Sequence, residues 1–412
     1  MMTNDNQHIP AGYKPSPLGP IPEDWEVNRL GDFSTFFSGG TPKSGNALYY
    51  NGTIPFIRSG EINRDRTELF LSQEGIYNSS AKFVEIGDIL YALYGANSGQ
   101  CSLSKINGVI NQAILCIRPE ADRYYIMTFL QLNKDHYYNS YLQGGQGNLS
   151  GEIVSNYKIA IPPIEEQHRI VSVLSLWDNA IEKQTALIEQ LTLRKRGLMQ
   201  QLLTGKKRLK GFSGEWKEVK LKEIGVFFKG SGVPKDCIID KGYKCLTYGD
   251  LYTKYDYVIS NVNSFIDDDT ANTSTQIQYG DICFAGSGET KEDIGKCAAF
   301  IDDKIGYAGG DIIVFRANGH NSITLSYLLN SDNAIRQKSS MGQGHSVVHI
   351  YPYQLEKLTL RIPSKKEQDA IASILTEADK EIEIQKQKLA AMQEQKKGLM
   401  QVLLTGKRRI II

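Results

Sequence analysis

The chain has 412 residues with a formal net charge of +1, and 41% of them are hydrophobic, which is typical of a folded protein of roughly two to four domains at about 150 residues each. No stretch approaches the roughly 18 consecutive apolar residues of a membrane span, and the first residues lack a secretory signal pattern, so we expect a cytoplasmic protein. The near-neutral charge also excludes a strongly basic nucleic-acid binder, so any contact with DNA depends on locally arranged groups.

Residues 10–160 are rich in glycine and hold short apolar runs such as 88–93. Short apolar runs bounded by turn signals predict strands, and the segment 123–133 predicts a helix among them. Residues 211–361 have the same character, with a helix expected over 323–339. We therefore expect two globular units of the α+β class.

A long helix is predicted over 161–210. Pro162 and Pro163 cannot continue a strand ladder but suit a first helical turn. Glu166 follows, where the helix dipole favours a negative charge. At the far end Gly205 is followed by basic residues, which is typical of a helix C-terminus.

The segment 362–409 repeats this helix. Copies starting at Ile161 and Ile362 align without a gap at an offset of 201 residues, and 22 of 49 positions are identical. The block GLMQ-x-LLTGK occurs at Gly197 and again at Gly398. A duplicated segment of this length indicates an internal repeat.

The segments that precede the two helices also correspond, although their loops differ in length. Trp25 corresponds to Trp216, and GQGN at 145–148 to GQGH at 342–345. The predicted domains are a first globular unit, a first helical region, a second globular unit and a second helical region, at 10–160, 161–210, 211–361 and 362–409.

Apolar residues in both helical regions alternate spacings of four and three, which is the heptad pattern of a coiled coil. Both copies carry Gln and Lys at the same seam positions, and buried polar residues in a seam usually set its register. A two-fold relation between the repeats predicts that the two helices, each about 60 Å long, pair antiparallel with the globular units at opposite ends. The alternative is that each helix packs only on its own globular unit. The predicted seam consists of Ile170, Leu174, Trp177, Ile181, Gln184, Ile188, Leu191, Leu198, Leu202, Ile371, Leu375, Ala378, Ile382, Gln385, Leu389, Met392, Leu399 and Leu403.

Sequence motifs of several enzyme classes are absent. The chain has no P-loop and no nucleophile elbow, and the glycines around Ser287 precede charges rather than an apolar helix. The six cysteines have no C-x-x-C spacing, so we interpret them as reduced and mostly buried thiols. His345 and His349 fall in an expected strand, about 13 Å apart, which is too far to share a metal ion. We expect no metal site and no catalytic residue.

The opening PLGPIPEDWEVNRLGD (17–32), the run IPPIEEQ leading into the first helix and GLMQQLLTGKKR ending it resemble the specificity subunit of type I restriction–modification systems. IPFIRSGEI (54–62) and EIGDILYALYG resemble motifs of that family's target recognition domains, and FSGEWKEVKLKEIG (212–225) resembles its entry to the second half. The second unit departs from the pattern, since Thr247 stands where the first unit has Arg58.

This resemblance implies two target recognition domains, each reading one half of a split DNA sequence, and an antiparallel coiled coil that sets the unread spacer. It implies that two methyltransferase (modification) subunits dock on the helices and that restriction/translocase subunits join them. The complete complex is then an adenine-specific methyltransferase and an ATP-dependent endonuclease. S-adenosylmethionine, ATP and Mg are expected in the partner subunits, with no cofactor in this non-catalytic chain.

For contacts with double-stranded DNA we expect polar residues in loops of both units, partly because they occupy paired positions. The glycine-rich loops around Gln146 and Gln343 have an alternative interpretation as turns that need glycine's backbone freedom. A solvated surface role also stays open for each residue. The predicted contacts are Lys43, Arg58, Arg64, Asn97, Gln146, Asn148, Lys235, Thr247, Glu289, Lys291, Gln343 and His345.

Other functions stay open. A stand-alone, two-headed DNA-binding regulator needs strong binding without partners, which the near-neutral charge argues against. A coiled-coil scaffold without DNA predicts that charge reversal at Lys43 or Arg58 leaves function intact. A catalytic methyltransferase or nuclease subunit needs motifs that the chain lacks.

Overall fold

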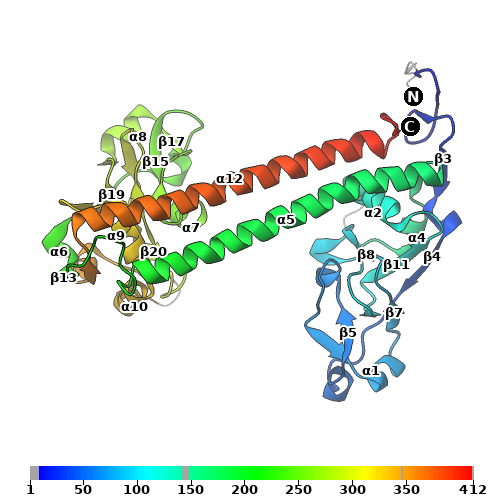
Figure 1. Ribbon diagram of the computed structural model, residues 1–412, viewed down its shortest axis with the longest axis horizontal. Coiled ribbons are helices and arrows are strands. Elements are labelled where there is room, and N and C mark those ends of the chain that lie inside the picture. Colours follow the sequence, from blue (N-terminus) through cyan, green and yellow to red (C-terminus); the bar gives the residue numbers. More distant parts are fainter. Residues whose placement is uncertain (1–8, 142–147, 345–346, 411–412) are drawn as a thin grey trace. The chain divides into compact units, whose positions relative to one another are not determined.

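The computed structural model describes residues 9–141, 148–344 and 347–410 (Figure 1). The chain divides into two compact units. Unit 1 is Met1–Thr185 with Gln387–Ile412, and unit 2 is Ala186–Lys386. Each unit therefore combines one globular head with the first part of one long helix and the last part of the other.

The head of unit 1 contains two four-stranded sheets. The first is antiparallel throughout, and in the second the two central strands are parallel and the outer pairs antiparallel. The first sheet has the order β4 (Ser34–Ser38), β11 (Ile114–Pro119), β8 (Ile89–Ala92) and β9 (Cys101–Leu103), and the second β6 (Leu69–Leu71), β5 (Ile54–Ile57), β10 (Gly108–Ile110) and β7 (Lys82–Val84).

The first sheet is buried on both faces, as the uninterrupted apolar run of β8 predicts. Leu90 and Cys116 pack with Ile57 of the second sheet on one face. On the other face Ile89 and Tyr91 share a core with α2, α5 and the end of α12. The sheet therefore joins the head to the long helices.

Shorter elements complete the head of unit 1. The strands are the paired β1 (Tyr13–Lys14) and β2 (Ile21–Pro22) and the paired β3 (Glu26–Arg29) and β12 (Lys158–Ile161), and the helices are η1 (Leu30–Phe33), η2 (Ala47–Tyr50), η3 (Ser59–Glu61), α1 (Gln73–Tyr77), η4 (Gly95–Asn97), α2 (Arg123–Leu132), α3 (Lys134–Tyr141) and α4 (Gly151–Ser155).

The head of unit 2 repeats this topology. Its first sheet has the order β14 (Gly225–Lys229), β23 (Ile312–Ala317), β19 (Asp281–Ala285), β21 (Cys297–Phe300) and an added edge strand β16 (Val258–Ile259), and its second β17 (Phe265–Ile266), β15 (Tyr243–Leu246), β22 (Gly306–Ala308) and β18 (Thr275–Ile277). The remaining elements are the paired β13 (Lys217–Lys220) and β25 (Thr359–Ile362), the paired β20 (Ser287–Gly288) and β24 (Val348–His349), and the helices α6 (Leu221–Ile224), η5 (Lys235–Cys237), α7 (Tyr248–Thr253), α8 (Asp268–Thr273), α9 (Ser322–Leu329), α10 (Asp332–Met341) and α11 (Pro352–Leu355). The predicted α+β class and the internal repeat are confirmed.

The helix expected over 323–339 is two helices in the structure. α9 ends at Leu329 and α10 starts at Asp332. The side chain of Asn330 causes the break, because its amide donates to the backbone carbonyls of Ser326 and Cys297, at 2.9 and 2.7 Å. Asn and Ser are residues that often end or start helices by bonding local backbone.

The two long helices are α5 (Ile164–Leu202) and α12 (Lys365–Leu403), each of 39 residues. Each is followed, three residues after its last residue, by a glycine with positive φ, Gly205 at 68° and Gly406 at 70°, as the C-terminal motif predicts. Every predicted seam residue is buried or partly buried. Among the described residues, no helix is long and apolar enough to cross a membrane.

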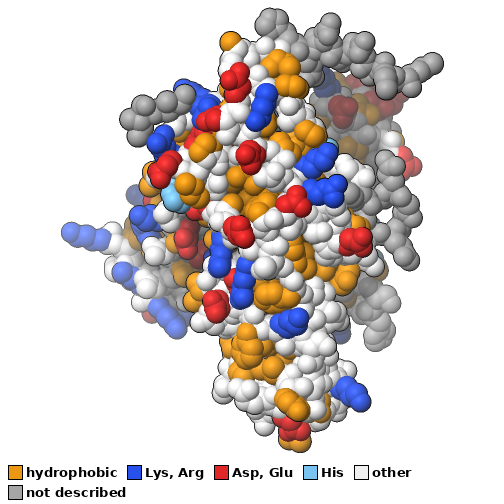
Figure 2. All heavy atoms as spheres, turned by 90° about the vertical axis from the view of Figure 1, so that its right-hand side faces the viewer, with side chains coloured by type: hydrophobic (Ala, Val, Ile, Leu, Met, Phe, Trp, Pro, Cys, Tyr) orange, Lys and Arg blue, Asp and Glu red, His pale blue; other side chains and the backbone are white. Residues whose placement is uncertain are grey.

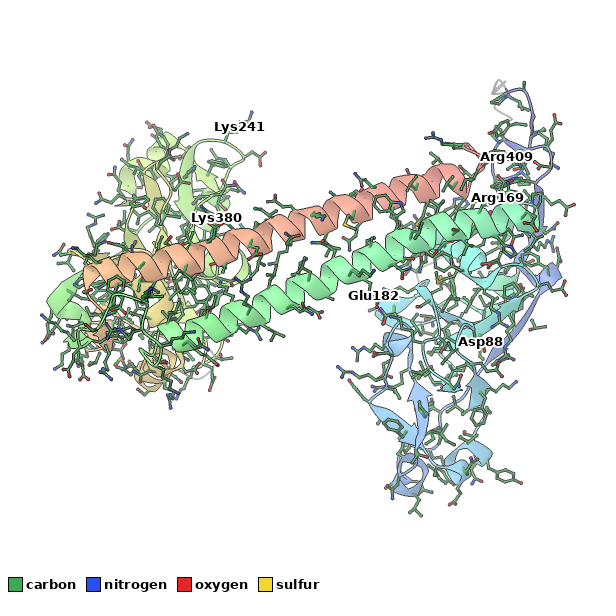
Figure 3. All side chains as sticks on the ribbon, viewed as in Figure 1. Asp88, Arg169, Glu182, Lys241, Lys380 and Arg409 are labelled. Carbon is green, nitrogen blue, oxygen red and sulfur yellow. The ribbon has the colours of Figure 1, made fainter. Side chains whose placement is uncertain are left out.

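The two helices pair antiparallel in each unit. In unit 1, Glu166 of α5 bonds Arg409 just beyond α12, and Asp178 bonds Lys396, so numbers rise along one helix as they fall along the other. Figure 3 shows Arg409 beside Arg169 at this end of the pair. In unit 2, Lys195 of α5 bonds Asp379 of α12 and Arg208 bonds Glu367, so the two helices run antiparallel there as well. The predicted antiparallel pairing is confirmed.

A carboxylate between the helices joins each head to the helix pair. In unit 1, Asp178 accepts hydrogen bonds from Tyr124 of α2 and from the Lys396 ammonium, whose Nζ lies 2.5 Å from Oδ1. Burial and the bond to Asp178 raise the pKa of Tyr124, so the phenol stays protonated. One carboxylate therefore connects α2, α5 and α12.

Unit 2 repeats this cluster at positions shifted by about one repeat. Asp379 of α12 accepts from Tyr327 of α9 and from Lys195 of α5. The Lys195 ammonium also lies 4.7 Å from the ring centre of Tyr257. The side chain of Lys195 is only 10% exposed, so Asp379 neutralises a nearly buried charge.

We expect Asp379→Asn to lower the free energy of unfolding by about 2 kcal/mol, because it leaves the nearly buried Lys195 ammonium without its anion. Lys195→Met should cost less than about 1 kcal/mol, since Asp379 is 38% exposed and keeps its bond to Tyr327. Urea denaturation of the two variants measures the difference.

The matched control is the exposed pair of Lys365 and Asp369, each 48% exposed. Asp369→Asn should cost less than about 0.5 kcal/mol, because exposed ion pairs contribute little. An Asp379→Asn variant as stable as this control would contradict the role of the cluster.

The fully buried carboxylate of Asp88 makes the stability of unit 1 depend on pH. Burial alone would raise its pKa, but hydrogen bonds from Arg118, at 2.7 and 2.9 Å, and the charges of Arg118 and Arg123 hold the pKa below its ordinary value of 3.8. A lowered pKa in the folded state stabilises the fold above the unfolded-state pKa, and this stabilisation is lost as pH falls through the folded-state pKa.

Asp88→Asn should therefore destabilise unit 1 near neutral pH, and its deficit should shrink below about pH 4. Urea unfolding from about pH 7 down to about pH 2 tests this. The exposed neighbour Glu85→Gln is the control and should follow the unmodified chain at every pH. A deficit that does not change with pH would contradict the assignment.

Candidate nucleic-acid interface

On the face that Figure 2 displays, charges of both signs are interspersed and no large patch of one sign is seen. This distribution agrees with the net charge of +1. Phosphate contacts fix register on a duplex and base-edge contacts read sequence, so an interface here depends on individual loop residues. The predicted contact residues are therefore placed one loop at a time.

The loop that carries Lys43 follows β4 and lies against the end of β10. A Cβ on Gly39 would lie 1.7 Å from the Ile110 carbonyl oxygen, so this close approach requires glycine. Thr41 Oγ1 donates to Gln112 Oε1 at 2.6 Å on the neighbouring loop. The start of the loop is thus fixed, and the Lys43 side chain is exposed beyond it.

Arg58 lies at the start of η3 and is held by two acids. Its Nε lies 3.1 Å from the nearly buried Glu61 and its Nη2 lies 2.5 Å from Glu68. Burial alone would raise the pKa of Glu61, but hydrogen bonds from Arg58 and from the backbone N–H of Glu68 lower it. Arg64 contacts the same Glu68 at 3.6 Å. A contact of Arg58 with DNA therefore competes with these internal bonds.

The remaining described residues of the first predicted set adjoin this region. Asn97 ends η4, and a Cβ on Gly60 of η3 would lie 3.7 Å from its amide nitrogen, so the two turns are neighbours. Asn148 is exposed, and the next residue, Leu149, donates to the Leu93 carbonyl at 3.1 Å. Leu93 in turn donates to Ala113, next to the residue that Thr41 contacts. We call these neighbouring segments, 39–46, 58–64, 93–99 and 148–150, loop cluster 1.

Unit 2 builds its loops on the same frame. A Cβ on Gly230 would lie 2.1 Å from the Gly309 carbonyl oxygen, which repeats the close approach of Gly39. Lys235 starts η5 in this loop. Thr247 is the N-cap residue of α7, and its Oγ1 donates to Asp250 at 2.9 Å. Thr247 therefore holds the turn that Arg58 and Glu61 hold in unit 1.

The segment 286–296 of unit 2 is longer than its counterpart and is held at both ends. Tyr252 Oη donates to the carbonyls of Ser287 and Asp293, at 3.0 and 3.1 Å. Ser287 Oγ lies 3.0 Å from His349 Nδ1, and β20 pairs there with β24. The buried Lys338 ammonium donates to the Gly295 carbonyl at 2.6 Å.

Between these anchors the tip of the segment is exposed, and it carries Glu289 and Lys291. Gln343 is also exposed and joins the same region, because its backbone exchanges two hydrogen bonds with His349, at 2.7 and 2.9 Å. The structure thus places Gln343 near the segment that carries Glu289 and Lys291. Gln146 and His345 lie outside the described residues.

Two heads of one topology, each carrying a cluster of exposed loops, characterise the chain. The family described as type I restriction modification DNA specificity domain matches residues 22–193 and again residues 213–394. The chain belongs to this family.

Related proteins are described as specificity subunits of type I restriction enzymes, and one of them matches along nearly the full length. The type I restriction enzyme MjaVIII specificity subunit of Methanocaldococcus jannaschii is 28% identical over 417 residues, covering 95% of this chain and 94% of that protein. The MjaIX specificity subunit of the same organism is 27% identical over 195 residues, covering 44% and 45%. The crystal structure of the type I restriction–modification system S subunit from M. genitalium has a TM-score of 0.59 at 16% identity, covering 92% of this chain and 96% of that chain. At 16% identity, the similarity to the S subunit from M. genitalium concerns the fold alone.

Several residues that hold these specificity domains together were not predicted from the sequence. Glu166 and Glu367 each bind an arginine at the far end of the partner helix, as Asp178 and Asp379 bind a lysine. The available signal was their identity between the repeats at an offset of 201 residues. Tyr252 carried no such signal, because it lies in α7, in a part of the head where the two repeats differ in sequence and length.

We expect Tyr252→Phe to loosen segment 286–296 of the second specificity domain, because the substitution removes the hydroxyl that bonds two of its carbonyls. A loss of about 1 kcal/mol corresponds to roughly fivefold faster opening. Hydrogen exchange measured by mass spectrometry over this segment tests it. Tyr279→Phe, at a side chain 65% exposed, is the control; equal exchange in the two variants would contradict the anchoring role.

Proposed function

We propose that this chain is the DNA-recognition subunit of a type I restriction–modification complex and that it reads a bipartite target. Each specificity domain reads one half of the target, and the paired helices set the unread spacer. The observation that carries the proposal is the duplicated family match, which covers both heads and most of both helices. The relatives' description as specificity subunits supports the same function.

The loops support a division of roles within each head. Glycines fix the start of the loops at Gly39 and Gly230. Exposed polar side chains extend from the frame, such as Lys43 beyond Gly39 and Lys291 at the tip of segment 286–296. Base edges in the major groove are read by such side chains, whereas the frame that holds them carries no sequence information. We therefore assign sequence reading to the predicted loop residues.

The charge of the chain supports dependence on partners. Non-specific DNA affinity grows with the number of phosphates neutralised, and a chain whose 47 basic residues are balanced by 46 acidic ones has little net attraction for DNA. We propose that two modification subunits dock on the helices and supply further phosphate contacts. Exposed apolar side chains on the helices, such as Leu176 at 66%, Leu193 at 64% and Ile384 at 60%, provide surface for docking.

In this proposal the chain itself carries no chemistry and resides in the cytoplasm with its DNA. S-adenosylmethionine binding and adenine methylation belong to the modification subunits. ATP- and Mg-dependent translocation and cleavage belong to the restriction subunits. The chain contributes the choice of sequence and the surface on which the other subunits assemble.

The test is to map methylated adenines in DNA from cells that express the chain with its modification and restriction partners. We expect a bipartite motif with a fixed spacer. Replacing residues 10–160 by the corresponding domain of another family member should change one half of the motif and leave the other half and the spacer unchanged.

A single-residue variant refines this test. Lys291→Glu should weaken or alter only the half-site read by the second domain, whereas the same charge change at exposed Lys380 of α12 should leave both halves unchanged. A domain exchange that alters both half-sites would contradict the modular assignment. Methylation without any bipartite motif would overturn the proposed function itself.

A further inference from the structure

The C-terminal ends of the two long helices are equivalent in sequence but differ in burial. In unit 1 the indole of Trp25 is 0% exposed and Met400 near the end of α12 is 8% exposed. The equivalent residues of unit 2, Trp216 and Met199, are only partly buried. The same end of the repeat is therefore covered in one unit and open in the other.

The cover in unit 1 is the hairpin of β1 and β2. Tyr13 Oη donates to the carbonyl of Gly406, the glycine that ends α12, at 2.7 Å. Pro22 approaches so closely that a Cβ on Gly406 would lie 2.5 Å from its Cδ. Ile21 is 3% exposed in the same core as the last turn of α12, and Asp24 pairs with Arg409 at 2.8 Å. A short segment with five prolines (10–24), which ends in Glu23 and Asp24 and carries one cation, Lys14, thus seals this helix end.

Among the described residues of unit 2, the segment that leads from α5 to Trp216, residues 205–215, forms no strand and so no counterpart of this hairpin. The atoms nearest to a Cβ on Gly205 would be those of the Trp216 ring, at an ordinary distance of 3.6 Å. Arg208 is the counterpart of Arg409. It donates a hydrogen bond to the Gly214 carbonyl, whereas Arg409 pairs with Asp24. The helix end that is sealed in unit 1 therefore lacks its cover.

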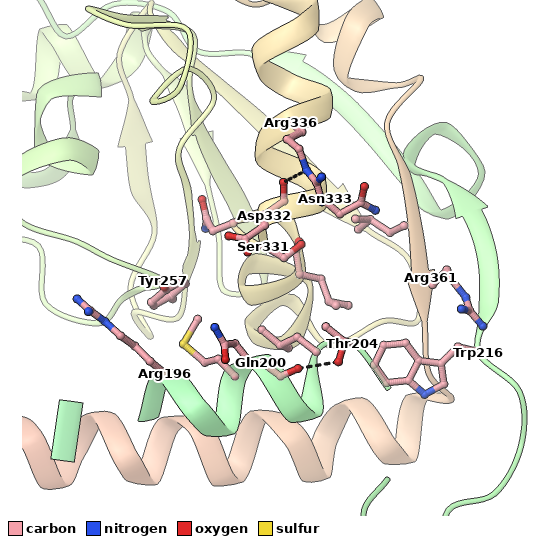
Figure 4. A pocket seen from close by; sticks show the side chains of 15 residues that line it. Arg196, Gln200, Thr204, Trp216, Tyr257, Ser331, Asp332, Asn333, Arg336 and Arg361 are labelled. Atoms are coloured by element: carbon pink, nitrogen blue, oxygen red, sulfur yellow. Dashed lines mark hydrogen bonds between the residues drawn. The ribbon is translucent and has the colours of Figure 1, made fainter. Parts of the chain in front are cut away.

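A cavity of about 520 Å³ lies at this open end of unit 2. Its apolar lining includes Met199, Leu203 and Trp216, which are equivalent to residues that unit 1 buries. Figure 4 shows Arg196 beside Tyr257 at one end of the cavity and Arg361 beside Trp216 at the other. Cavities of this size accept a drug-sized molecule or a few peptide side chains.

The lining is basic. Arg196, Arg336 and Arg361 are exposed, and Asp332 is the one acidic residue among the lining residues. In the part of the chain that the structure describes, none of these three arginines pairs with a carboxylate within 4.0 Å. By the offset of 201 residues, Arg361 corresponds to Ala160 in unit 1, so this charge belongs to unit 2 alone. An acidic occupant complements such a surface.

We propose that this cavity of unit 2 is a docking site for an extended, acidic, proline-containing segment of the modification subunit. The segment takes the place that the hairpin of β1 and β2 takes in unit 1. Apolar and proline side chains pack on Trp216 and Leu203, and carboxylates pair with Arg196 and Arg361. This proposal rests on the proposed function only in its choice of partner. It makes one of the two repeats a distinct attachment point.

The first test uses the full-length chain and a fluorescein-labelled peptide of residues 10–24, which has the chemistry of the natural cover. Fluorescence anisotropy should show saturable binding of one peptide per chain. In Arg196→Glu/Arg361→Glu the affinity should fall about tenfold, since two attractive contacts become repulsive. Lys380→Glu reverses a single charge on an exposed site of the same unit, outside the cavity, and should leave the affinity unchanged.

The second test replaces the peptide with the purified modification subunit. The double variant should assemble with it at least tenfold more weakly than the Lys380→Glu control. The peptide should compete with this assembly. If the peptide fails to bind, or binds the double variant equally well, the docking site is overturned. If the peptide instead disperses dimers of this chain and leaves assembly unaffected, the occupant is a second copy, and the proposal is also overturned.

Neither binding measurement contains DNA. A negative result in them therefore contradicts the docking site without contradicting the proposed function. A chain that directs methylation to a bipartite motif but binds no peptide retains the function and lacks the docking site. A chain that binds the peptide but directs no methylation retains the site and lacks the function.

Discussion

The fold depends on one carboxylate in each unit, Asp178 and Asp379. Each lies where a head meets both long helices, and each binds a tyrosine of the head and a lysine of the opposite helix. Apolar heptad positions alone tolerate sliding by a whole heptad, whereas a nearly buried lysine has one position at which it finds its anion. The cluster therefore fixes the pairing of the helices and the attachment of the head through the same charge.

The frame and the loops of each head follow different physical rules. In the frame, buried strands and paired charges such as Asp88 with Arg118 and Asp281 with Arg316 recur in both units. In the loops, Arg58 with its two acids in one unit corresponds to Thr247 with Asp250 in the other. Different side chains thus hold the same turn, which leaves the exposed tips able to differ between the heads.

Most of the architecture could be predicted from the sequence, because the gapless repeat and the heptad spacing are local patterns that one chain displays twice. The break at Asn330 could not, since it depends on a bond to Cys297 from a distant strand. The loop contacts were predicted only as residue types, and their partners, such as Glu68 for Arg58, arise from the tertiary fold. The contrast between the covered and open helix ends required the structure, because Trp25 and Trp216 are identical in sequence.

The composition of the two units has a consequence for biosynthesis. Unit 2 is one continuous stretch, Ala186–Lys386, whereas unit 1 needs Gln387–Ile412 to complete it. Met400, Leu403 and Leu404 fill a core that also contains Ile170 and Leu174. During synthesis the first head to leave the ribosome is therefore the last to close its core, which reverses the usual order in which domains fold from the N-terminus. A ribosome that stops early releases a chain whose second unit is whole and whose first unit exposes apolar surface.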